Sequence, residues 1–149
     1  MADDPKFPPL TIRALRGTPV EVPLNYVLGT SAVAIHKAPL LLVDLETEEG
    51  VTGRTYLFCY LPAAAPAITS LLEEVERIVK GEVITPAELW KKLTRRFTLI
   101  GVQGIVRMAM SAFDTASWDA LAIAAGKPLQ ISSGQRRAIF PPTIAAGSD

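Results

Sequence analysis

The sequence predicts an α+β domain in which a three-stranded antiparallel meander is followed by a three-helix bundle. Three short stretches before residue 60 have the apolar and β-branched character of strands, and helical spacing of apolar residues begins after Pro62. Strands followed by helices indicate segregated elements rather than alternating βα units. The length of 149 residues suits one hydrophobic core and excludes a complete (β/α)₈ barrel, which takes about 250 residues.

Composition excludes several classes of function. The 15 basic and 15 acidic residues balance, without Lys/Arg blocks, so we expect neither nucleic acid nor a membrane as partner. One cysteine (Cys59) excludes a disulfide framework, and one histidine (His36) excludes a site with two imidazole ligands. The acidic start resembles no signal peptide and no apolar run reaches membrane-spanning length, so we expect a cytoplasmic, reducing location.

The first strand is predicted over Leu10–Val22, and Pro19 and Pro23 place it near a sheet edge. The next segment, Leu24–Pro39, shows no sustained period, and we interpret it as a long loop. Loops of that length inside a small domain are usually functional.

The second and third strands are predicted as a hairpin formed by Leu40–Glu46 and Val51–Tyr60. Three helices follow. The first carries an apolar face over 68–79 and ends at Gly81. The second begins with a Thr85–Glu88 capping box and buries Leu89, Trp90, Leu93 and Phe97. The third ends near residue 125, and its small residues permit close approach of a neighbouring backbone: Ala109, Ala112, Ala116 and Ala120.

Few side chains suggest chemistry. Asp44, Glu46 and Glu48 alternate and could bind a hard cation, but we favour a solvated hairpin face. Cys59 lies between aromatic residues and is interpreted as an inert, packed thiol. His36, in the predicted loop, is the one titratable group that we consider a candidate for substrate contact, although surface exposure is the favoured interpretation.

Two carboxylates, Asp114 and Asp119, lie in the otherwise apolar third helix. An ionised carboxylate in such a place must be paired or hydrogen-bonded. We therefore favour a structural partner, such as Arg107 or a backbone donor, over catalysis.

Several segments resemble one known family. They occur in the same order and with similar spacing as in the mandelate racemase and muconate lactonizing enzyme family of the enolase superfamily, nearest to the pattern of its mandelate racemases. The segments are Ala38–Leu45, Tyr56–Tyr60, Arg96–Gly101, Arg107–Leu121 and Gly126–Leu129. The resemblance implies that residues 10–129 form the N-terminal capping domain of such an enzyme.

The resemblance also implies that the capping domain and the barrel domain have different roles. In this family the cap covers the mouth of a barrel, and two cap segments shape substrate specificity. By position, the residues that would face substrate here are Leu28, Thr30, Ala32, Ile35 and Tyr56. Their largely apolar character suits an apolar or aromatic group on the substrate.

Catalysis in the family is Mg²⁺-dependent abstraction of a proton α to a carboxylate, as in racemases, dehydratases and cycloisomerases. The bases and metal ligands belong to the barrel, so no catalytic or metal-binding residue and no cofactor is assigned to this chain. We expect a truncated protein that is inactive alone, self-associates through its barrel-facing surface, and meets a small carboxylate substrate only if a barrel is present. The alternatives are a stand-alone binding or structural module and the cap of a split enzyme with a separately encoded barrel.

The two ends are predicted to differ from the domain. Residues 1–9 are expected to be a flexible N-terminus, and residues 130–149 a largely irregular tail. The family continues with Leu-Leu-Gly and Tyr-Asn-Ser segments, where this chain has Ser132, Ser133 and Gly134 and later residues without period. Some codon choices that encode residues 130–149 in the present frame also encode both the Leu-Leu-Gly and the Tyr-Asn-Ser segments when they are translated from the third base onward. We therefore interpret the tail as frameshifted by one lost base near Leu129 and Gln130.

Sequencing the gene across the codons of Leu129 to Asp149 tests this interpretation. We expect a second reading frame that encodes Leu-Leu-Gly and then Tyr-Asn-Ser at family-like spacing. Codons that yield no such sequence in either other frame would refute the frameshift.

Overall fold

The computed structural model describes residues 7–29, 31 and 34–129. Its elements are β1 (Ile12–Gly29), β2 (Ala34–Thr47), β3 (Thr52–Phe58), α1 (Ala64–Val79), α2 (Pro86–Arg96) and α3 (Ile105–Ala124). The strands form one antiparallel sheet in the order β1-β2-β3, which confirms the predicted meander followed by three helices. The interpreted tail and residues 1–6 of the N-terminal segment lie outside the described residues. At its edge, Phe7 packs against Trp118 with ring centroids 6.1 Å apart.

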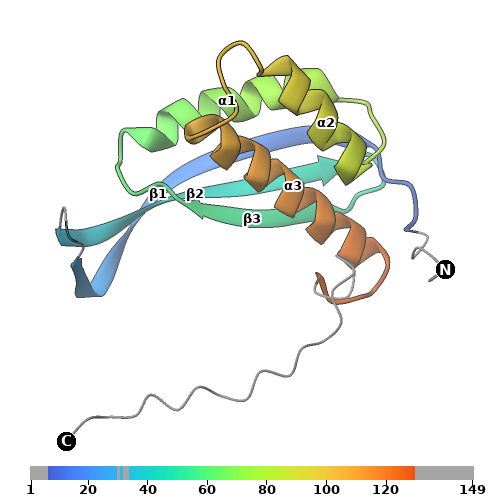
Figure 1. The fold of residues 1–149 in the computed structure, drawn as a ribbon. Coiled ribbons are helices and arrows are strands. Elements are labelled where there is room, and N and C mark those ends of the chain that lie inside the picture. Colours follow the sequence, from blue (N-terminus) through green and yellow to red (C-terminus); the bar gives the residue numbers. More distant parts are fainter. Residues whose placement is uncertain (1–6, 30, 32–33, 130–149) are drawn as a thin grey trace, which may run out of the picture.

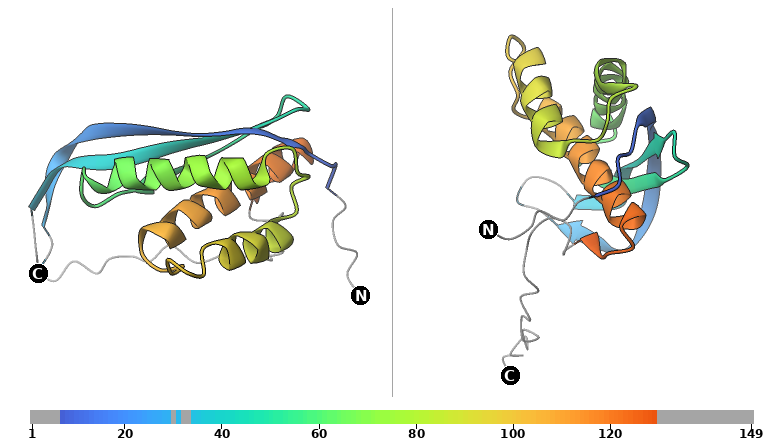
Figure 2. Two further views of the ribbon diagram at one scale, coloured as in Figure 1. Left: turned by 90° about the horizontal axis from the view of Figure 1, so that it is seen from above. Right: turned by 90° about the vertical axis from the view of Figure 1, so that its right-hand side faces the viewer.

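The helices form a layer on one face of the sheet (Figures 1 and 2). Helix α1 packs on β1, α3 packs on β3 and β2, and α2 contacts α3 and α1. The core lies between these layers, because alternate residues of β2 such as Leu41 and Val43 are buried against apolar residues of α1 and α3. No helix within the described ranges is long and apolar enough to cross a membrane.

Gly53 marks the closest approach between the sheet and a helix. A Cβ built on Gly53 would lie 2.8 Å from the backbone nitrogen of Ala120 and 2.9 Å from its Cβ, and it would also collide with the carbonyl oxygen of Ala116. Real Cβ atoms do not approach other atoms so closely. The predicted close approach along the small residues of α3 is therefore confirmed, with β3 as the neighbouring backbone.

The predicted long loop over Leu24–Pro39 is wrong. Its two ends extend β1 and β2 into a hairpin arm, in which Leu28 pairs with Ile35 and Gly29 with Ala34. Figure 1 shows this arm projecting beyond the helices. The register shifts between Pro23 and Leu28, which interrupts the alternation by which a strand is recognised. Cross-strand hydrogen bonds thus stabilise a strand that side-chain patterning does not reveal.

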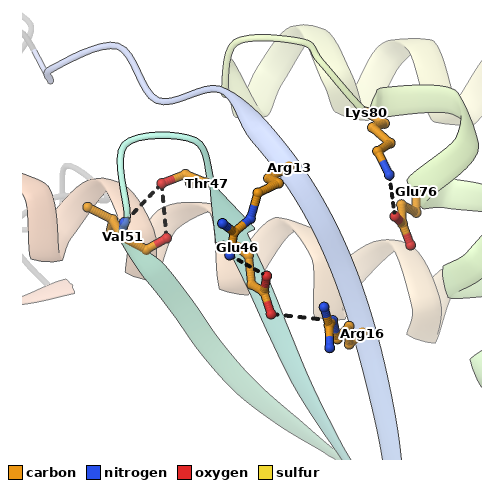
Figure 3. Close-up of polar contacts among 7 residues, drawn as sticks. All are labelled: Arg13, Arg16, Glu46, Thr47, Val51, Glu76 and Lys80. Carbon is orange, nitrogen blue, oxygen red and sulfur yellow. Dashed lines mark hydrogen bonds and ion pairs between the residues drawn. The ribbon is translucent and has the colours of Figure 1, made fainter.

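Individual residues at the ends of strands and helices determine where these elements stop and start. In the β2–β3 turn, the buried Thr47 hydroxyl donates to the carbonyl of Val51 at 2.9 Å and accepts from its N–H at 3.1 Å (Figure 3). Gly81 follows α1 with φ of 80°, as its predicted role in ending the helix requires. Thr85 precedes α2, but its side chain makes no capping hydrogen bond, so the predicted capping box is wrong; Pro86 at the first turn supplies the start signal instead.

Gly53→Ala should destabilise the domain by about 3 kcal/mol or more, because the added methyl group meets backbone atoms of α3 that cannot move independently. The free energy of unfolding, measured by urea denaturation followed by circular dichroism, provides the test.

Gly29→Ala is the matched control, since a Cβ at Gly29 meets nothing within 4 Å. We expect it to change stability by less than about 0.5 kcal/mol. Equal effects of the two substitutions would contradict the proposed contact between β3 and α3.

Candidate functional site

The face of the sheet that points away from the helices is organised in rows of residues across the three strands. Strand register places Arg16, Asp44 and Arg54 side by side. Two residues further along each strand, where side chains return to the same face, the register aligns Thr18, Leu42 and Tyr56. The next row, again two residues on, consists of Val20, Leu40 and Phe58. This face therefore has a charged end and an apolar end.

At the charged end the carboxylates neutralise arginines. Glu46 accepts a hydrogen bond from Arg13 at 2.7 Å and lies 3.3 Å from Arg16 (Figure 3), and Asp44 lies 3.2 Å from Arg54. The hydrogen bond from Arg13, with the charges of both arginines, holds the pKa of Glu46 below its ordinary value.

At the apolar end aromatic residues are exposed. Tyr56 is 65% exposed and its row partner Leu42 is 43% exposed. Phe58 contacts Tyr60 edge to face, with ring centroids 5.1 Å apart. Tyr60 has φ of 63°, which is uncommon for a residue with a side chain and which turns the chain from β3 toward α1. The result is an apolar surface that water contacts in this chain.

The hairpin arm holds the other predicted substrate-facing residues. Leu28 is 47% exposed, whereas its partner Ile35 is only 8% exposed. Thr30 and Ala32 lie outside the described residues. The structure therefore pairs Leu28 with Ile35 but leaves only Leu28 of the two accessible.

The structure does not bring Tyr56 to the pair formed by Leu28 and Ile35. Tyr56 lies opposite Leu42, and Leu42 is seven positions along β2 from Ile35. Seven residues of extended strand span roughly 23 Å. The predicted substrate-facing residues thus form two regions, the apolar end of the sheet face and the hairpin arm.

Sequence reasoning singled out Ile35 and His36 but missed Tyr60 and Leu61, which lie beside them. A hollow at the base of the arm is lined by Ile35 and His36 of β2 together with Tyr60 and Leu61, which follow β3. His36 is exposed there and lies on β2 rather than on the predicted loop. The only sequence signal for Tyr60 was its place in an aromatic run before a proline, and that signal does not predict a positive φ.

Residues 12–131 match the family described as the mandelate racemase / muconate lactonizing enzyme, N-terminal domain. The chain belongs to this family.

Relatives of known structure agree with this assignment. An enolase from Bradyrhizobium, crystallised with magnesium and mandelic acid, is 36% identical, has a TM-score of 0.80, and is matched over 87% of this chain and 36% of its own. An enolase from alpha pretobacterium bal199 with bound magnesium is 38% identical with a TM-score of 0.79, matched over 84% of this chain and 34% of its own. An arabinonate dehydratase from Saccharolobus solfataricus is 26% identical over 118 residues, which are 75% of this chain and 30% of that protein. The chain spans about a third of the length of these relatives.

Magnesium is bound in the crystal structures of two of these relatives. The question for this domain is whether its described residues could hold a magnesium ion. Within 7–29, 31 and 34–129 no three His, Cys, Asp or Glu side chains lie together in a way that could hold a metal ion. Of the three candidates in the sequence, Asp44 and Glu46 are engaged by arginines, and Glu48 is exposed in the turn after β2. The described residues do not fit a magnesium site.

The other candidates have structural surroundings. Asp119 accepts a hydrogen bond from the backbone N–H of Arg54 at 2.8 Å, as predicted for a backbone donor. Asp114 has no such partner among residues 7–29, 31 and 34–129, and Arg107 lies over the ring of Trp90 instead, 5.4 Å from its centroid. Cys59 is buried, and burial raises the pKa of its thiol, in agreement with an inert, packed residue.

Glu46→Gln should make the stability of the domain less sensitive to acid. Because the pKa of Glu46 in the folded state lies below the ordinary 4.5, the ionised carboxylate stabilises the fold above that value. This contribution is lost as the pH falls through the folded-state pKa. Urea midpoints at pH 7 and pH 3 should therefore differ less in the variant than in the unmodified chain.

Glu73→Gln serves as control, since Glu73 is exposed on α1 and makes no ion pair among the described residues. An equal loss of midpoint on acidification in Glu46→Gln and in the unmodified chain would contradict a stabilising role of the Glu46 ion pairs.

Proposed function

We propose that this chain is the substrate-specificity cap of an enzyme that abstracts a proton α to a carboxylate, and that it performs no chemistry without a barrel domain. Membership in the mandelate racemase family supports the reaction class. The observation that carries the proposal is the exposed apolar end of the sheet face, where Tyr56 and Leu42 lie side by side beneath no helix. In the proposed enzyme, the base and any metal ligands come from the barrel.

The chain's own residues would bind and shield the substrate rather than react with it. Tyr56 offers an aromatic ring, and burying it against an apolar group of the substrate removes both surfaces from water. Leu28, in the separate region formed by the arm, is assigned a substrate-facing role by family resemblance, as are Thr30 and Ala32. Exclusion of water from the reacting carboxylate is the expected effect on catalysis.

We also propose that the protein works in the cytoplasm. A single buried cysteine with a raised thiol pKa is compatible with a reducing cytoplasm, where disulfides are rare. Self-association through the surface that a barrel would cover is expected when the chain is alone.

The absence of chemistry in the chain alone is tested by α-proton exchange. The purified chain is incubated with Mg²⁺ and mandelate in D₂O, and the Cα–H signal of mandelate is followed by NMR, with an active mandelate racemase as positive control. We expect the signal to persist as in buffer alone. Deuterium incorporation that depends on the chain would overturn the proposal.

The role of Tyr56 is tested in a hybrid enzyme in which residues 7–129 of this chain replace the matching region of the Bradyrhizobium enolase. Tyr56→Ala should weaken mandelate binding about tenfold, which is 1.4 kcal/mol, because the aromatic contact is lost. Tyr56→Phe should retain most of the affinity. Leu99→Ala, at an exposed residue between α2 and α3, is the control for general effects. Unchanged affinity in Tyr56→Ala would refute the substrate contact.

A further inference from the structure

The chain turns sharply at Tyr60, directly after β3. The N–H of Leu61 donates to the carbonyl of Cys59 at 2.7 Å, and this hydrogen bond closes a three-residue turn centred on Tyr60. Because φ of Tyr60 is 63°, the turn is of the γ-turn form that is rare and strained. Glycine adopts a positive φ without steric cost, so the presence of a tyrosine here requires a physical reason.

Both ends of this turn are fixed to the body of the domain. The N–H of Cys59, whose side chain is buried in the core, donates to the carbonyl of Pro39 in β2 at 2.8 Å. The carbonyl of Leu61 accepts the N–H of Ala64, the first residue of α1, at 3.0 Å. The surroundings therefore hold the strained conformation in place, and the turn presents Tyr60 in one direction.

The core does not account for the tyrosine side chain. Tyr60 is 66% exposed and does not belong to the core that the described residues form between sheet and helices. Its ring contacts Phe58 edge to face. It also lines the hollow at the base of the arm, together with Ile35 and His36 of β2, and the volume of this hollow is about 180 Å³. The side chain thus lies against the arm rather than the core.

The arm needs support at its base. It projects beyond the helices (Figure 1), and its pairing shifts register between Pro23 and Leu28, so the ladder of cross-strand pairs is interrupted there. Ile35 is nevertheless only 8% exposed, although it is not part of the described core. Of the described residues that share its hollow, only the segment 60–62 comes from outside β2. This segment is therefore the part of the domain body against which the arm rests.

We propose that Tyr60 braces the hairpin arm and is thereby a positioning residue for substrate specificity. The strained turn holds the ring at the base of the arm, where it limits the movement of Ile35 and of Leu28, the partner of Ile35 across the hairpin. The effect on substrate rests on the proposed function, because Leu28 is assigned a substrate-facing role there. The brace itself rests on the contacts at the arm's base.

The brace is tested on the chain by amide hydrogen exchange followed by NMR. Tyr60→Asn removes the ring but suits the turn, because asparagine is enriched at positive φ. We expect protected amides of the arm, residues 22–29 and 34–38, to exchange at least tenfold faster, and those of Val43 and Leu45 to be unchanged. The urea midpoint should not fall, whereas a merely structural role of Tyr60 would lower it.

Tyr60→Phe is the matched control, because it keeps the ring and should leave the exchange of the arm as it is in the unmodified chain. Two results would overturn the brace. One is unchanged exchange of the arm in Tyr60→Asn. The other is equal acceleration of the arm and of the buried part of β2, which would mean that Tyr60 stabilises the whole domain.

The consequence for specificity is tested in the hybrid enzyme. Tyr60→Asn should weaken mandelate binding about fivefold, because the loosened arm no longer holds Leu28 in one place, and Tyr60→Phe should bind as the unmodified hybrid does. Leu99→Ala is again the control. Unchanged affinity despite a loosened arm would refute the positioning role. Weakened affinity with unchanged exchange of the arm would show that Tyr60 contacts substrate directly, and would also overturn the proposal.

Tyr56→Ala in the same hybrid separates this inference from the proposed function. If Tyr56→Ala weakens mandelate binding and Tyr60→Asn does not, the cap determines specificity without the brace, and only the further inference fails. If the arm loosens in Tyr60→Asn while neither substitution changes mandelate binding, the proposed function fails and the positioning role fails with it.

Discussion

The contact between Gly53 of β3 and the helix α3 is the constraint on which the rest of the structure depends. Backbone meets backbone there, because Ala116 and Ala120 present almost no side chain and Gly53 presents none. This backbone contact holds α3 against β3, so that the helices cover one face of the sheet. It also determines which side chains are left outside: the outward rows of the sheet on one side, and Asp114 and Trp118 on the other.

The same contact protects an edge strand. β3 ends the sheet, so N–H groups along its free side lack a neighbouring strand. Asp119, one residue before Ala120 on α3, accepts the N–H of Arg54 and occupies one such position. β1 is the opposite edge of the sheet. Pro19 and Pro23, which lack an N–H group, are tolerated there because the free side of β1 has no neighbouring strand to which an N–H would donate. The structural role that the sequence favoured for Asp119 is thus explained by the geometry of the sheet edge.

Sequence patterns predicted the features that depend on neighbours along the chain. The helices, the β2–β3 hairpin and the small-residue face of α3 all follow from spacing, and the family resemblance supplied the domain type. The arm was missed because its strands are specified by pairing across the hairpin, with a shifted register near Pro23. The positive φ of Tyr60 could not be predicted, and neither could the lack of a partner for Asp114 within the described part of the chain, since both depend on which residues the fold brings together.

Two features of this domain are costly for a protein that works alone. The exposed row of Leu42 and Tyr56 keeps apolar surface in water, and the partly buried carboxyl of Asp114 has no donor among the residues that the structure describes. A small domain has little stability to spare for either. Both lie where the core makes no use of them. Under the proposed function, the surface that covers the exposed row belongs to a barrel domain, so this domain folds with Leu42 and Tyr56 left open to water.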